Sequence, residues 1–94
     1  MAKFAVIGLG KFGYKLATTL AHKGAEVMAI DRDKKLVDQI KDEVSVAICL
    51  DSRDLEALQA VGLEEVDVAV VSIGEDFESR QLTTLHLKEI GVPK

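Results

Sequence analysis

Three glycines near the start of the chain have the spacing of a phosphate-binding loop. Gly8, Gly10 and Gly13 form the pattern G-x-G-x-x-G directly after an apolar run that ends at Ile7. In such a loop the first glycine permits a tight turn, the second lets the backbone approach a pyrophosphate, and the third lets the next helix pack close to the strand. The helix's first N–H groups and the positive end of its dipole then face the phosphates. The pattern alone is a weak signal, because glycines also make ordinary turns.

An acidic residue stands where the ribose-binding carboxylate of such a loop belongs. Asp31 ends the second apolar run of the chain. A carboxylate there accepts hydrogen bonds from both ribose hydroxyls and repels a 2′-phosphate, which disfavours NADP, although the neighbouring Arg32 leaves NADP open. The alternative role for Asp31 or Asp33 is a cap on the following helix. We predict that Asp31 binds the ribose and that Asp33 is the cap.

Other candidate residues surround the same site. Lys11 either reaches a phosphate from the first helical turn or is an ordinary solvated residue. Asp51 and Ser52 follow the third apolar run, where they either meet the adenine or cap the next helix. Ile73 and Gly74 end the fourth run, where a glycine either admits a ligand closely or makes the turn.

Four runs rich in Val, Ile and Ala alternate with segments of helical periodicity. The runs are nearly continuous in apolarity, which is typical of strands buried on both faces of a parallel sheet. Glycines mark the ends of the helical segments. The expected strands are 3–8, 26–31, 44–50 and 67–73. The expected helices are about 12–23, 36–40, 55–61 and 76–90; the first, third and fourth end just before Gly24, Gly62 and Gly91.

This order of elements predicts an α/β fold, a Rossmann-like doubly wound parallel sheet. Right-handed crossovers give the strand order 3-2-1-4, with a nucleotide crevice at the carboxyl ends of the strands, where the order reverses between strands 1 and 4. No linker or repeat divides the sequence. We therefore expect residues 1–94 to form a single domain.

Composition excludes several classes of function. The net charge of -4 and the pI of about 5.1 argue against a nucleic-acid surface. The apolar runs are much shorter than the roughly 20 residues of a membrane-spanning helix.

The cysteine and the two histidines of the chain are not predicted to form a site. Cys49 stands between apolar neighbours and is predicted to serve in packing. His22 and His86 lack the partners of a catalytic or metal site, so we predict no catalytic residue and no metal ligand.

Six blocks of the sequence together cover much of the chain. They are V-I-G-L-G-K-F-G at 6–13, A-I-D-R-D at 29–33, D-S-R-D at 51–54, A-V-G-L at 60–63, V-S-I-G at 71–74 and L-T-T-L-H-L-K-E-I-G-V-P-K at 82–94. With these blocks the sequence resembles the N-lobe of the potassium-transport nucleotide-binding family, also called KTN, RCK N-lobe or TrkA-N-like. The final block is much more specific than the glycine loop.

The resemblance implies a cytoplasmic regulatory domain, peripheral to the inner membrane through a potassium channel or transporter subunit. It would bind NAD(H) or ATP/ADP to control gating, with no turnover of its own. Lys11 is often Arg in the family, which implies a weaker phosphate contact here. Carried over by position, Gly8, Gly10, Lys11, Phe12 and Gly13 would meet the phosphates, Asp31 and Arg32 the ribose and adenine side, and Asp51 and Ser52 the adenine.

Family N-lobes continue beyond I-G-V-P into further strands and an oligomer-building helix, so the resemblance also implies a truncated N-lobe of about four strands. The fourth strand would have an open edge, and the leucines and isoleucine of the last helix spread too widely for one contact. We therefore expect self-association as a homodimer, or as a larger ring in the full-length protein.

Two alternatives for the function stay open. One is the nucleotide-binding half of an NAD-dependent dehydrogenase lacking its catalytic domain, and the other is a foldable fragment without function. The final helix block favours the transport family.

Overall fold

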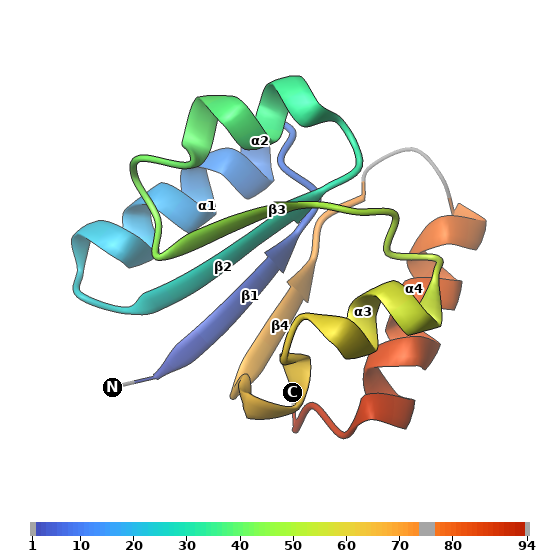
Figure 1. Ribbon diagram of the computed structural model, residues 1–94. Coiled ribbons are helices and arrows are strands. Elements are labelled where there is room, and N and C mark those ends of the chain that lie inside the picture. The colour runs from blue at the N-terminus through green and yellow to red at the C-terminus, as the bar shows by residue number, and fades with distance from the viewer. Residues whose placement is uncertain (1, 74–76, 94) are drawn as a thin grey trace.

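The computed structural model describes residues 2–73 and 77–93 and contains one four-stranded parallel sheet (Figure 1). Its strand order is β3-β2-β1-β4, as the sequence predicted, with every neighbouring pair parallel. The strands are β1 (Lys3–Ile7), β2 (Glu26–Asp31), β3 (Val46–Cys49) and β4 (Val68–Val71), and the helices are α1 (Lys11–His22), α2 (Lys34–Ile40), α3 (Leu55–Ala60), the 3-10 turn η1 (Leu63–Glu65) and α4 (Phe77–Ile90).

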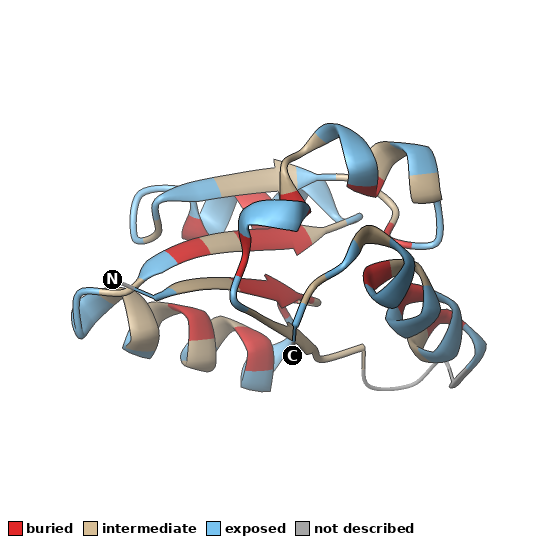
Figure 2. Ribbon diagram, turned by 90° about the horizontal axis from the view of Figure 1, so that it is seen from below, coloured by how far each residue is buried: buried red, intermediate tan, exposed pale blue. Residues whose placement is uncertain are grey.

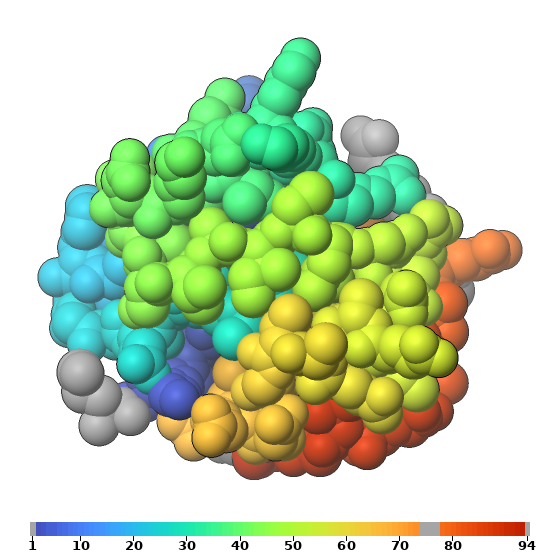
Figure 3. Space-filling model, in the orientation of Figure 1, coloured from blue at the N-terminus to red at the C-terminus, as the bar shows by residue number. Residues whose placement is uncertain are grey.

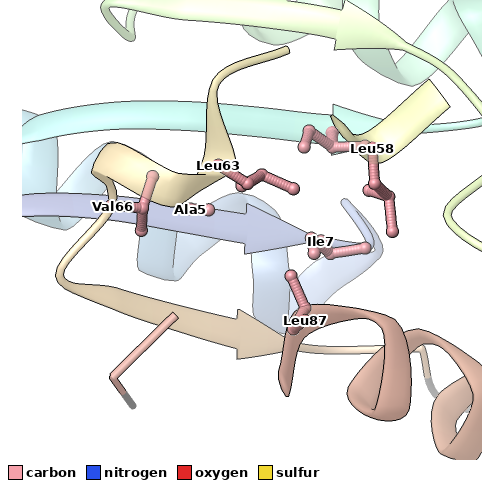
Figure 4. Close-up of a cluster of buried hydrophobic side chains, with 7 residues drawn as sticks. Ala5, Ile7, Leu58, Leu63, Val66 and Leu87 are labelled. Carbon is pink, nitrogen blue, oxygen red and sulfur yellow. The ribbon is translucent and has the colours of Figure 1, made fainter. Parts of the chain in front are cut away.

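The helices form two layers on opposite faces of the sheet. Helices α1 and α2 cover one face, while α3, η1 and α4 cover the other (Figure 1). Buried residues concentrate on the strands and on the helix faces turned toward them (Figure 2). Beneath α3, η1 and α4, one apolar cluster joins strand residues to helix residues (Figure 4). The members that Figure 4 labels are Ala5, Ile7, Leu58, Leu63, Val66 and Leu87.

The outer strands are shorter and less buried than predicted. β3 and β4 contain no fully buried residue, whereas three of the five residues of β1 are buried. The reason is the strand order, which places β3 and β4 at the two edges of the sheet. In the space-filling view β3 runs across the front of the molecule between α2 and α3 (Figure 3). The prediction of burial on both faces therefore holds only for the two central strands.

Cys49 shows the consequence for a single residue. It ends the edge strand β3 and is exposed, with its thiol 3.4 Å from the carbonyl oxygen of Arg32. The prediction that Cys49 packs in the interior was wrong: the predicted strand order already places β3 at an edge, and apolar neighbours in the sequence do not bury the last residue of an edge strand.

Most helix boundaries follow the predicted signals. Gly24 follows the C-cap residue of α1, Lys23, and Gly91 directly follows α4. Both glycines take positive φ angles, 91° and 100°, and their N–H groups donate back to the carbonyls of Ala21 and Leu87. The turn η1 was not predicted; it follows Gly62, whose φ is 82°. The predicted start of α4 near residue 76 lies outside the described residues.

No helix within the described part of the chain combines the length and apolarity needed to span a membrane.

Candidate functional site

A cavity of about 280 Å³ opens at the carboxyl edge of the sheet. Loops that follow all four strands contribute to it, with one residue each from α2 and α4. This is the predicted position of the nucleotide crevice. The cavity is lined by Ile7, Gly8, Leu9, Gly10, Ile30, Asp31, Arg32, Leu36, Leu50, Asp51, Ser52, Arg53, Ser72, Ile73 and Ser79.

Two of the three loop glycines are required by the fold. A Cβ on Gly8 would overlap the backbone carbonyl of Ser72, and the φ of Gly8 is +101°. A Cβ on Gly13 would overlap the backbone carbonyl of Gly8, so only glycine lets α1 approach β1 this closely. The predicted roles of Gly8 in the turn and of Gly13 in helix packing are therefore confirmed.

Gly10 is different, because the described protein atoms leave its side-chain position empty. Apart from its chain neighbours, no described atom lies within 4 Å of where a Cβ would stand. Its φ of -68° is one that any residue can adopt. Gly10 nevertheless lines the cavity. The missing side chain at this position therefore leaves room that the fold itself does not use.

Gly10 is also the N-cap of α1. Its carbonyl accepts the first helical bond, from the N–H of Tyr14 at 2.8 Å, but it has no side chain that could cap the first turn. The carboxylates of Asp33 and Asp54 cap α2 and α3 by accepting from Lys35 and Ala57. The cap by Asp33 confirms the prediction.

Asp31 joins two parts of the cavity wall. Its carboxylate accepts one hydrogen bond from the N–H of Leu9 at 2.7 Å and another from the N–H of Asp33 at 2.8 Å. It thus holds the glycine loop against the carboxyl end of β2. Each carboxylate oxygen keeps further acceptor capacity, so these bonds leave Asp31 able to accept hydroxyl groups. The contact with Leu9 was not predicted, since nothing local in the sequence signals it.

The segment after β3 carries an ion pair at the cavity. The guanidinium of Arg53 lies 2.8 Å from the carboxylate of Asp51, which also accepts from the backbone N–H of Arg53 at 3.0 Å. These hydrogen bonds are the main reason that the pKa of Asp51 falls from 3.8 to about 2, with Arg32 adding a smaller electrostatic effect. Sequence reasoning did not select Arg53, although its position just after a strand end could have suggested it.

Ser52 lines the cavity, but its hydroxyl is turned toward α4. The Oγ of Ser52 lies 2.8 Å from the Oγ1 of Thr83, in a buried contact. The predicted alternative for Asp51 and Ser52, a cap on the next helix, was wrong because Asp54 provides that cap.

The remaining predicted residues divide into those at the cavity and those outside it. Arg32 and Ile73 line it, whereas Lys11 and Phe12 are exposed on the first turn of α1 and do not. Gly74 lies outside the described residues. Eight cavity residues were not among the predicted site residues: Ile7, Leu9, Ile30, Leu36, Leu50, Arg53, Ser72 and Ser79. Leu50 and Ser72 directly follow strands and could have been found, but Leu36 and Ser79 come from helices whose packing the sequence does not give.

The described residues, 2–73 and 77–93, contain no group of three His, Cys, Asp or Glu side chains that could hold a metal ion. The residues that line the cavity contribute backbone N–H groups, serine hydroxyls, two carboxylates and two guanidinium groups. This set can bind a phosphorylated, hydroxyl-bearing ligand.

Comparison with known proteins matches the TrkA-N domain family to residues 4–94. The chain is 44% identical over 90 residues to Ktr system potassium uptake protein C of Bacillus subtilis, covering 96% of this chain and 41% of that protein. It is 36% identical over 90 residues to Ktr system potassium uptake protein A of Vibrio alginolyticus, covering 96% and 41%. The chain therefore spans less than half the length of these relatives.

Solved structures share the fold. The NAD(P)-binding domain of an exopolyphosphatase-related protein from Archaeoglobus fulgidus matches with a TM-score of 0.83 and 25% identity, covering 97% of this chain and 68% of that one. The TrkA-N domain of the inner membrane protein ybaL from Escherichia coli matches with a TM-score of 0.72 and 16% identity, covering 96% and 82%. Together with the family match over nearly the whole sequence, these comparisons show that the chain belongs to the TrkA-N domain family.

Proposed function

We propose that this domain binds an adenine nucleotide, NAD(H) or ATP/ADP, in the cavity at the carboxyl edge of the sheet, and thereby regulates a potassium uptake system. The observation that carries the proposal is Gly10. It lines the cavity at the start of α1, and no other described part of the protein occupies its side-chain position. A pyrophosphate is the group that such a position admits.

The other cavity residues fit the remaining parts of a nucleotide. The free acceptor capacity of Asp31 suits the ribose hydroxyls, and its negative charge disfavours a 2′-phosphate. Leu36 and Leu50 offer apolar surface for a base, beside the ion pair of Asp51 and Arg53. Lys11 and Phe12 flank the phosphate position from the exposed first turn of α1.

Regulation without turnover is consistent with the side chains at the cavity. Among the described lining residues there is no His, Cys, Lys or Tyr, and both carboxylates already accept hydrogen bonds from the protein. The family match and the potassium uptake relatives support a role at a membrane transporter subunit, on its cytoplasmic side. The bound nucleotide would act by favouring one conformation of the complete protein.

Self-association is part of this proposal. The outer edge of β4 has no strand beside it in the described sheet, and Leu82 and Leu85 on α4 are 39% and 52% exposed. A symmetric dimer would cover such a surface with a second copy of itself. Sedimentation equilibrium at micromolar concentration tests this: a monomer mass near 10.2 kDa would refute it.

Calorimetric titration with NAD⁺, NADH, ATP and ADP tests nucleotide binding. We expect at least one to bind, and Asp31→Ala to weaken that binding by at least about tenfold, because charge-assisted hydrogen bonds to the ribose are lost. The same variant also frees the N–H of Leu9, so its circular dichroism spectrum must match that of the parent. A parent that binds none of the four, or an unchanged dissociation constant in the variant, contradicts the proposal.

A further inference from the structure

Helix α4 is hydrogen-bonded to the segment 51–54, three residues of which line the cavity. Thr83 is fully buried, and its Oγ1 lies 2.8 Å from the Oγ of Ser52, which is 8% exposed. The two hydroxyls are 31 positions apart in the sequence. A hydroxyl pair buried this deeply is costly to break, because each partner would be left without its hydrogen bond.

His86 makes a second hydrogen bond from the same helix. Its Nε2 lies 2.9 Å from the backbone carbonyl oxygen of Arg53. Since a carbonyl only accepts, Nε2 must be the donor in this bond. Nδ1 is buried and has no hydrogen-bond partner among the described residues. The bond to Arg53 is therefore the polar contact that fixes this ring.

Thr83 and His86 are three residues apart and so face the same side of α4. Neither lines the cavity, but the segment that they hold does, through Asp51, Ser52 and Arg53. Because Arg53 carries both the ion pair with Asp51 and the carbonyl that His86 binds, the position of that ion pair depends on α4.

We infer that Thr83 and His86 are positioning residues for the nucleotide site, and that nucleotide binding is energetically coupled to the packing of α4. This inference rests on the proposed nucleotide-binding function. If the nucleotide contacts the segment 51–54 only in the position that α4 imposes, loosening α4 must weaken binding. By linkage, binding must in turn tighten α4.

Thr83→Val tests the coupling, because it removes the hydroxyl while keeping the shape of the side chain. Titration with NAD⁺, NADH, ATP and ADP should show a dissociation constant about tenfold higher than the parent's for each nucleotide that the parent binds. Thr83→Ser, which retains the hydroxyl, should restore the parent's value. Thr84→Val is the matched control, since the hydrogen bond recorded for the Thr84 hydroxyl among the described residues is to the carbonyl of Arg80, one turn earlier in the same helix. It should bind like the parent.

His86→Ala provides a second, independent variant should Thr83→Val fold poorly, and it should weaken binding in the same direction. Amide hydrogen exchange supplies a readout that a purely structural role would not move. Saturating nucleotide should slow exchange across α4 in the parent and in Thr84→Val, but much less in Thr83→Val.

The outcomes separate the two proposals. A parent that binds none of the four nucleotides overturns the proposed function, and this inference with it. A parent that binds, together with a folded Thr83→Val or His86→Ala of unchanged affinity, overturns the inference alone. Failure of Thr83→Ser to restore binding also overturns it.

Discussion

Three helices of this domain begin at the same edge of the sheet, but they begin in two different ways. Helices α2 and α3 start at Asp33 and Asp54, whose carboxylates accept hydrogen bonds from their own first turns. Helix α1 starts at Gly10, which has no side chain to do this. A carboxylate cap both satisfies N–H groups and repels an anion. Of these three starts, only that of α1 remains suited to a phosphate.

The glycine loop itself contains the same contrast. Gly13 is held by the packing of α1 against β1, while the described protein leaves Gly10 unconstrained. If this comparison is right, a side chain at position 13 must mainly destabilise the fold, whereas a side chain at position 10 must mainly impair binding.

Gly13→Ala should have the largest effect on stability. Its Cβ, whose position is fixed by the backbone, would overlap the backbone carbonyl of Gly8, so α1 must shift away from β1. We expect a loss of about 2 kcal/mol or more in the free energy of unfolding, in spite of alanine's higher helix propensity. Urea unfolding measures this. Gly10→Ala is the control and should stay within about 1 kcal/mol of the parent; equal losses in the two variants would contradict the comparison.

Gly10→Val should instead abolish nucleotide binding with little harm to the fold. The branched side chain would fill the space beside the start of α1 that we assign to the pyrophosphate. Thermal unfolding with and without saturating NADH or ADP separates the two effects. We expect a melting temperature close to the parent's without nucleotide and no increase on adding it. A variant that gains as much as the parent would place the phosphates elsewhere.

The sequence allowed the prediction of those features that depend on local geometry or chain order. Strand order follows from alternating elements and right-handed crossovers, and the roles of Gly8, Gly13 and Asp33 follow from backbone geometry alone. Several of the errors and omissions involve contacts between distant segments. Cys49 was placed in the interior because its sequence neighbours are apolar, although it ends an edge strand and is exposed.

Ser52 illustrates the same limit at the site. Its hydroxyl pairs with Thr83 on the last helix, a partner that neither spacing nor composition could identify. The bond from Leu9 to Asp31 likewise joins two segments that the pairing of β1 with β2 brings together. The sequence thus predicted a cavity at the carboxyl edge of the sheet, but it could not indicate which polar groups hydrogen-bond within the protein instead of facing a ligand.

The capped helices offer a smaller test of the comparison. Asp33→Ala and Asp54→Ala each remove a carboxylate that caps a helix, so each should lower the free energy of unfolding by about 1 kcal/mol. Neither carboxylate belongs to a cavity-lining residue, and we expect dissociation constants for NADH or ADP to stay within about twofold of the parent's. A large loss of affinity in either variant would show that the capped starts also contribute to the site.

Breaking the ion pair of Asp51 and Arg53 should have the smallest effect on the free energy of unfolding, and this effect should depend on pH. The pKa of Asp51 is lowered to about 2 in the folded protein, from 3.8, so the folded state favours the charged carboxylate. This contribution is fully present above pH about 4 and is lost as the pH falls through about 2. Both side chains are roughly 40% exposed, so solvent screening reduces it to about 1 kcal/mol or less. Arg53→Gln should therefore be less stable than the parent at pH 6 by that amount, and the gap should close between pH about 4 and 2. Urea unfolding of both proteins across this range measures the gap, and a constant gap would mean that Arg53 stabilises the segment by packing, independently of the charge on Asp51.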